Sequence, residues 1–181
     1  MANAKTLDVK IGPAKVEFGD VASGNGAVFD ITKGGIQFQV STTTQQSTVD
    51  QFGDTPVKSI MKGRTAQVTV PFALYDLEKL AKVMPNSELV KDATDPDKMK
   101  LTVNAQSGFD MLSVAQKLVI KPLDPSATPN EWVTIPIASP RADIEFTYDA
   151  DNERVANITF EAYPDENGVL FILGDETATE S

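Results

Sequence analysis

Alternation of apolar and polar residues with a period of two is the feature that most constrains this chain. Successive side chains of a β-strand point to opposite faces, so such a run has one face for a core and one for solvent or a partner. Runs of this kind occur at residues 14–18, 36–41, 66–72, 99–104 and 133–138. Two more runs, 142–148 and 156–162, flank an Asp- and Asn-containing turn at 149–154 and predict a long hairpin.

One segment breaks this alternation. Residues 72–84 carry apolar side chains at spacings of three and four, which predicts a helix that Pro85 ends. A helix with one apolar stripe is expected to pack across the end or the side of a sheet. Near the end of the chain, residues 169–173 are apolar throughout and predict a strand covered on both faces.

The chain has 181 residues and shows neither an internal repeat nor a second composition regime. We therefore expect one domain over residues 1–181 with a short flexible tail at 175–181. The strand and helix patterns together predict an antiparallel β-sandwich or partly closed barrel with one α-helix.

Composition narrows the possible functions. The chain has no cysteine and no histidine, which excludes disulfides, Cys/His zinc sites and Ser–His–Asp triads. Its net charge of −10 does not favour nucleic-acid binding, because Lys and Arg supply most of that binding by neutralising phosphates. We expect a protein that is not an enzyme and that needs no cofactor or metal.

The first residues lack the apolar core of a signal peptide, and no run reaches the ~20 apolar residues of a membrane helix. We therefore expect no Sec-type export and no membrane binding by this chain.

The segment 49–64 raises a separate question. In this segment the apolar residues Phe52, Val57, Ile60 and Met61 lie among charged residues and turn formers. We expect residues 44–64 to form a long loop between two strands. Either another chain covers these side chains, or the loop folds back and buries them against its own sheet. The sequence leaves both interpretations open.

The order of several short strings resembles the major tail tube protein of tailed bacteriophages. TKGGI at 32–36 precedes a strand, DQFGDTPV at 50–57 is followed by MKGR at 61–64, and then come a strand and a helix. The ending FEAYPDENGVLF at 160–171 is also similar to the last strands of that family. The resemblance covers residues 28–85 and 142–175.

The resemblance implies a β-sandwich protomer, six copies of which close into a ring, and rings that stack into a hollow tube that conducts DNA to the host cell. The long loop would then make the inter-ring contact, through Phe52, Asp54, Val57, Lys58, Ile60, Met61, Lys62 and Arg64. Six chains would carry a charge on the order of −60, which repels DNA and lets it slide. Two polar strand faces are candidates for the lumen wall: Gln37, Gln39, Gln67 and Thr69, and, on the late hairpin, Asp143, Glu145 and Glu161.

The implied partners are further copies of the chain and other tail proteins: the tape measure, the tail terminator, and the baseplate or tip. DNA would pass without specific binding. The implied location is the virion tail, and the host cytoplasm during assembly.

Three alternatives remain at this point. The chain could form the tube of a phage-derived injection machine or a type VI secretion system. A monomeric β-sandwich binding module would require clustered exposed aromatic residues, whereas the chain has one Trp and three Tyr. A glycosidase would require two carboxyl groups about 5–10 Å apart in a cleft.

Overall fold

The computed structural model describes residues 10–144, 146, 148 and 153–179. Over these residues the fold is mainly β, with antiparallel strands and one α-helix. The strands are β1 (Ala14–Phe18), β2 (Ala27–Phe29), β3 (Gln37–Thr48), β4 (Pro56–Phe72), β5 (Ser87–Lys91), β6 (Met99–Val103), β7 (Gln116–Pro122), β8 (Val133–Ile144), β9 (Ala156–Tyr163) and β10 (Ile172–Leu173). The α-helix is α1 (Leu77–Val83), and three short 3-10 helices are η1 (Asp50–Phe52), η2 (Met111–Val114) and η3 (Pro129–Glu131).

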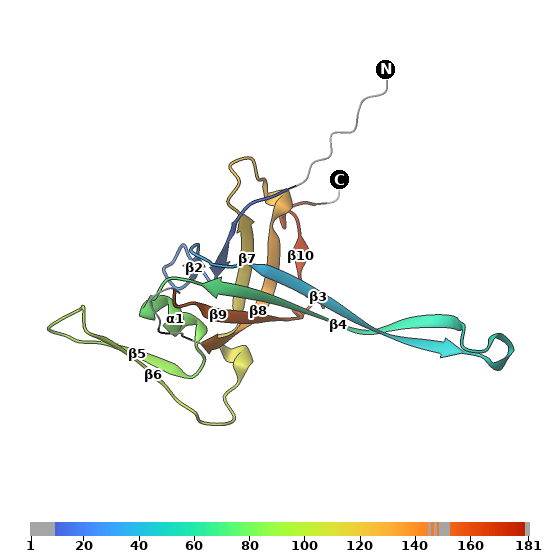
Figure 1. Ribbon diagram of the computed structural model, residues 1–181, viewed down its shortest axis with the longest axis horizontal. Coiled ribbons are helices and arrows are strands. Elements are labelled where there is room, and N and C mark those ends of the chain that lie inside the picture. The colour runs from blue at the N-terminus through green and yellow to red at the C-terminus, as the bar shows by residue number, and fades with distance from the viewer. Residues whose placement is uncertain (1–9, 145, 147, 149–152, 180–181) are drawn as a thin grey trace, which may run out of the picture.

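Eight strands form one sheet in the order β2-β1-β7-β8-β9-β4-β3, with β10 paired to β8 beside this path. Strands β5 and β6 form a separate hairpin. Figure 1 shows that the ends of β3 and β4 leave the body of the molecule on one side, and that β5 and β6 project on the opposite side.

The sheet curls, so that its first strands lie over its later ones. Phe18 on β1 contacts Phe160 on β9 with ring centroids 4.9 Å apart, and Phe29 on β2 contacts Phe72 on β4 at 5.0 Å. One isolated bridge, between Thr32 and Phe72, joins the chain after β2 to the end of β4. The described strands do not close into a barrel, so the expectation of a sandwich or partly closed barrel is confirmed only as a mainly β, antiparallel fold with one α-helix.

The alternating runs predicted the core of this sheet well. Val16 and Phe18 on β1 are buried, as are Val68 and Val70 on β4. The pairing of the late hairpin is also confirmed, because β8 and β9 pair from Ile137 opposite Tyr163 to Ile144 opposite Ala156. The first strand ends at Ile144, whereas the predicted run continued to residue 148. The turn of that hairpin at 149–152 lies outside the described residues.

One run was assigned to the wrong face. Val133, Ile135 and Ile137 were expected to alternate with polar residues on one core face, but a register irregularity between β7 and β8 changes the phase. Ile135 and Ala138 are both buried in the core, whereas Ile137 lies opposite Tyr163. An extra residue in one strand flips the faces of all residues that follow it.

The helix is shorter than predicted. It begins at Leu77 rather than at residue 72, because the Asp76 side chain accepts hydrogen bonds from the backbone N–H groups of Glu78 and Lys79. Phe72 still belongs to β4, where it lies opposite Ala156. Leu80 and Val83 are the buried residues of the helix, and Leu74 is exposed before it starts.

The prediction for residues 169–173 was wrong. Only Ile172–Leu173 form a strand, and the Leu173 side chain is 66% exposed, so the run is not covered on both faces. Strands β2, β5 and β7 were not predicted.

Candidate assembly surfaces

The segment 44–64, expected as a loop, is mostly strand. Strands β3 and β4 continue past the body as a two-stranded ribbon, and only residues 49–55, which include η1, form the turn between them. We call residues 44–64 the arm. A ribbon with no core beneath it does not need an apolar–polar alternation, which is why the sequence pattern gave no sign of strands here.

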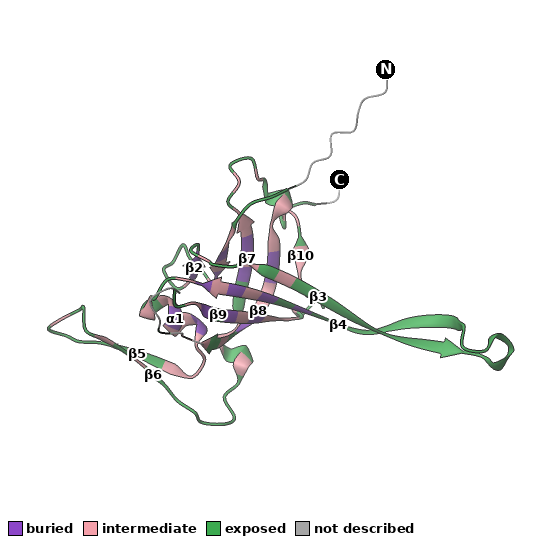
Figure 2. Cartoon of the chain, in the orientation of Figure 1, coloured by how far each residue is buried: buried purple, intermediate pink, exposed green. Residues whose placement is uncertain are grey.

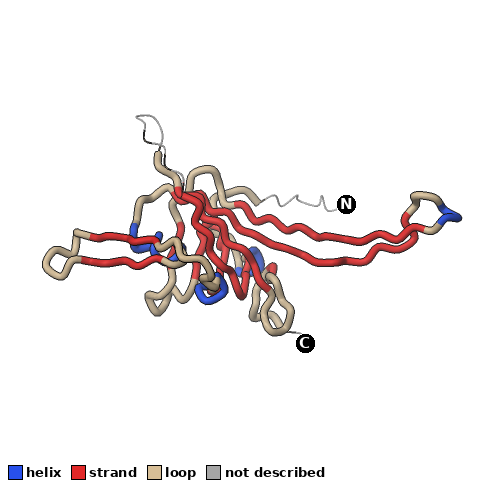
Figure 3. Tube along the Cα trace, turned by 90° about the horizontal axis from the view of Figure 1, so that it is seen from below, coloured by secondary structure: helices blue, strands red, loops and turns tan. Residues whose placement is uncertain are grey.

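The arm is exposed along its whole length (Figure 2). Its large apolar side chains are accessible: Phe52 is 65% exposed, and Val57, Ile60 and Met61 are 49%, 55% and 57% exposed. The interpretation in which the segment folds back over its own sheet is therefore wrong. Figure 3 shows the reason in another view, since the arm extends away from the sheet and from the β5–β6 hairpin.

The arm's charged residues find few partners within the chain. Arg64 donates from Nε to the Thr42 hydroxyl at 3.1 Å. Among the described residues, the side chains of Asp54, Lys58 and Lys62 form no hydrogen bond or ion pair. The eight residues predicted for the inter-ring contact thus lie together on the arm, all exposed.

The two predicted lumen faces are one surface. Gln39 lies opposite Gln67 in the β3–β4 pair, and Gln67 lies opposite Glu161 in the β4–β9 pair. Residues directly opposite each other in an antiparallel pair point to the same side of a sheet. We call this side the polar face; its members from the prediction are Gln37, Gln39, Gln67, Thr69, Asp143 and Glu161. Glu145 lies outside the described residues.

The opposite side of the same strands forms the core. Val68 and Phe160, the neighbours of Gln67 and Glu161 along their strands, are fully buried. A shallow depression of about 400 Å³ lies on the polar face, where β9 and β4 diverge, and Gln39, Gln67 and Glu161 are among the residues that line it.

Sequence reasoning missed the basic member of the polar face. Arg141 lies opposite Thr159, with Nε 3.2 Å from Asp143 Oδ2 and Nη1 3.2 Å from Glu161 Oε1. It therefore neutralises part of the acidic charge of this face. Its position two residues before Asp143 in the same strand was the available signal, because residues i and i+2 share a face.

Glu161 also changes the ionisation of its neighbour Tyr163. The Tyr163 hydroxyl donates to Glu161 Oε2 at 3.4 Å. Burial, together with the nearby carboxylate, raises the pKa of Tyr163 above its ordinary value, so the phenol stays protonated.

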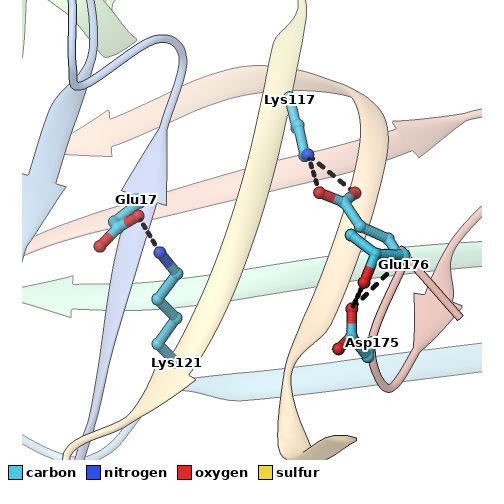
Figure 4. Close-up of polar contacts among 6 residues, drawn as sticks. Glu17, Lys117, Lys121, Asp175 and Glu176 are labelled. Carbon is cyan, nitrogen blue, oxygen red and sulfur yellow. Dashed lines mark hydrogen bonds and ion pairs between the residues drawn. The ribbon is translucent and has the colours of Figure 1, made fainter. Parts of the chain in front are cut away.

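Away from the arm and the polar face, the polar side chains hold the body together (Figure 4). Glu17 on β1 accepts a hydrogen bond from Lys121 Nζ on β7 at 2.5 Å and lies 2.9 Å from Lys15 Nζ. Partial burial of Glu17 disfavours its charged form and so raises its pKa, but the ammonium groups of Lys121 and Lys15 have the larger combined effect. They hold the pKa of this carboxyl below its ordinary value.

A second contact in Figure 4 joins Glu176, near the end of the described chain, to strand β7. Lys117 Nζ lies 2.5 and 2.7 Å from the two carboxylate oxygens of Glu176. Glu176 belongs to the segment 175–181 that was expected to be flexible, and the ion pair connects this part of it to β7.

Hydrogen bonds and ion pairs shift the pKa values of several described carboxyl groups. Each described carboxyl group whose pKa departs clearly from its ordinary value is shifted downward: Glu17, Asp20, Asp92, Asp124, Glu153 and Asp175.

Two further findings apply to the described part of the chain. No three Asp, Glu, His or Cys side chains there come together in a group that could hold a metal ion. No helix in it combines the length and apolar character needed to cross a bilayer.

The chain was also compared with known proteins. No protein-family model matches it, and no curated protein matches its sequence.

Proposed function

We propose that the protein is a structural subunit of a bacteriophage tail tube, in which hexameric rings stack into a hollow tube that conducts DNA. The observation that carries this proposal is the arm, which leaves the body as a ribbon and exposes the large apolar side chains of Phe52, Val57, Ile60 and Met61. Exposed apolar groups gathered on a projecting element are typical of a surface that another chain covers.

The energetics of the arm favour assembly. Fully burying a side chain of this kind contributes roughly 1.5–3 kcal/mol relative to leaving it exposed. Since Phe52, Val57, Ile60 and Met61 are each about half to two-thirds exposed, covering them recovers on the order of 1 kcal/mol apiece. A ring of six such arms sums these contributions over one ring-to-ring contact, which makes stacking cooperative.

The polar face is the surface we assign to the lumen. It combines amides and hydroxyls with two carboxylates and one arginine that is already paired with both. A wall of this kind offers DNA phosphates few free cations, so the counterion release that drives DNA binding is small. Low adhesion is what a conduit for a polyanion requires.

Electron microscopy of the purified protein tests the assembly. We expect rings or tubes from the wild-type chain, and only dispersed particles from the double variant Ile60→Asp and Met61→Asp. The matched control is Val103→Asp, which places a charge on an equally exposed apolar residue of the β5–β6 hairpin (54% exposed) and should leave assembly intact. Dispersed monomers of wild-type protein at high concentration would contradict the proposal.

Charge reversal on the polar face tests the lumen. In phage particles, the variant Asp143→Lys and Glu161→Lys should assemble normally and eject DNA more slowly. Two lysines and Arg141, which loses both partners, would then face the phosphates in each subunit. The control reverses two exposed acids of the β5–β6 hairpin, Glu88→Lys and Asp97→Lys, and should eject at the wild-type rate. Unchanged ejection with the polar face reversed would show that another surface lines the channel.

A further inference from the structure

The register of the arm places its two central apolar side chains on opposite faces of the ribbon. Ile60 lies opposite Gln45, and Met61 lies opposite Thr44, within a stretch of regular pairing between two register shifts. Consecutive residues of a regular strand point to opposite sides. Both side chains are more than half exposed, so the arm carries an apolar group on each face.

This arrangement differs from that of a strand which lies flat on one neighbour. A two-stranded ribbon has no interior, so covering one face leaves the other face in water. If a single flat surface covered the Ile60 face, Met61 would stay exposed, and the reverse would hold for the other face. Both side chains are buried only if protein lies on both sides of the ribbon.

The charge of the arm indicates which protein covers its two faces. The arm has two acidic and three basic residues, and all three basic residues (Lys58, Lys62 and Arg64) lie on its β4 side, whereas the chain as a whole carries −10. The β3 side of the arm, from Thr44 to Thr48, is uncharged. A net positive ribbon on a strongly acidic chain is complementary to other copies of that chain.

We propose that the arm of each subunit inserts between two other copies of the chain, with the Ile60 face against one copy and the Met61 face against the other. This inference rests on the proposed function and specifies its inter-ring contact. A closed ring has as many seams between subunits as it has subunits, so every arm of one ring would find one seam in the next. Each stacking contact would then also join two neighbours within a ring.

The absence of cysteine from the chain allows a direct test. Ile60→Cys and Met61→Cys are combined in one variant, labelled at both thiols with a maleimide photo-crosslinker, and assembled in small amount with an excess of unlabelled wild-type chain. The matched control combines Lys58→Cys with Ile60→Cys; Lys58 lies opposite Ser47 and therefore shares the face of Ile60. After irradiation, products are separated on a denaturing gel.

The expected result is a three-chain product from the Ile60/Met61 variant and only two-chain products from the Lys58/Ile60 control. Equal amounts of two-chain product from both variants, without three-chain product, would overturn the inference while leaving the tube intact. If wild-type chains form no rings or tubes, the proposed function itself fails.

A second measurement covers the case in which double labelling prevents assembly. Ile60→Cys and Met61→Cys are then labelled singly, and the crosslinked peptides are identified by mass spectrometry. We expect the two probes to attach to different segments of the neighbouring chains. Attachment of both probes to the same segment would overturn the inference.

Discussion

The two halves of β4 belong to one continuous strand but differ in burial and in strand pairing. From Ala66 to Phe72, every second residue is buried; β9 pairs with β4 from Gln67 to Phe72, and β3 pairs with it as far as Thr69. From Pro56 to Thr65, every residue is exposed, and only β3 is alongside. The first half is specified by a core within the chain. The second half carries apolar residues such as Val57, Ile60 and Met61, but no core of the described chain covers them.

The largest expected difference between the core and the arm is in their contribution to stability. Phe160→Ala removes a fully buried ring that packs against Phe18 and Phe29, and it should lower the free energy of unfolding by about 3–5 kcal/mol. Phe52→Ala on the arm should change it by less than about 0.5 kcal/mol. Denaturant unfolding of the unassembled subunit measures both. A comparable loss from Phe52→Ala would mean that the arm is part of the folded body.

A smaller effect is expected at the start of α1. Asp76→Ala removes the side chain that accepts from two backbone N–H groups, and it should destabilise the body by about 1 kcal/mol. Asp76→Asn keeps an acceptor at the cap and serves as the control, with most of the stability retained. Thermal unfolding compares the three proteins, and equal stability of the Ala and Asn variants would show that the cap contributes nothing.

The smallest predicted effect depends on pH. The folded-state pKa of Glu17 is lowered, so its ion pairs contribute stability above the ordinary pKa of the carboxyl and lose it as pH falls through the lowered value. Glu17→Gln should therefore be less stable than wild type by up to about 1 kcal/mol near neutral pH. The difference should shrink as the pH falls below 4.5. Unfolding curves at several pH values measure it, and a constant difference would rule out the ion pairs as its cause.

The same contrast explains what the sequence could predict. Residues 14–18 and 66–72 were identified because a core on one side imposes a period of two on them. The arm was read as a loop because no core imposes any period there, although Thr, Val and Ile favour strands. Strand β5 shows no period of two because Leu89 and Val90 are adjacent in it. The phase change in β8 depends on a bulge that apolar spacing does not reveal.

The candidate surfaces were predicted in part. The arm residues could be named because apolar side chains among charges and turn formers are conspicuous in any local window. The polar face could not be assembled from the sequence, since Gln67 and Glu161 become neighbours only when β9 pairs with β4, across more than ninety residues of chain. The role of Arg141 as a neutralising partner depends on the same long-range pairing.

The continuity of β4 has a mechanical consequence. Because one unbroken backbone runs from the tip of the arm into the centre of the sheet, a pull on the tip along the strand axis loads the ladder between β4 and β9 in shear, so that its hydrogen bonds resist together and do not peel apart one by one. In the assembly proposed above, tension between successive subunits would thus reach the buried core next to Phe160. The irregularity between Thr43 and Thr44 gives the ribbon a place to bend.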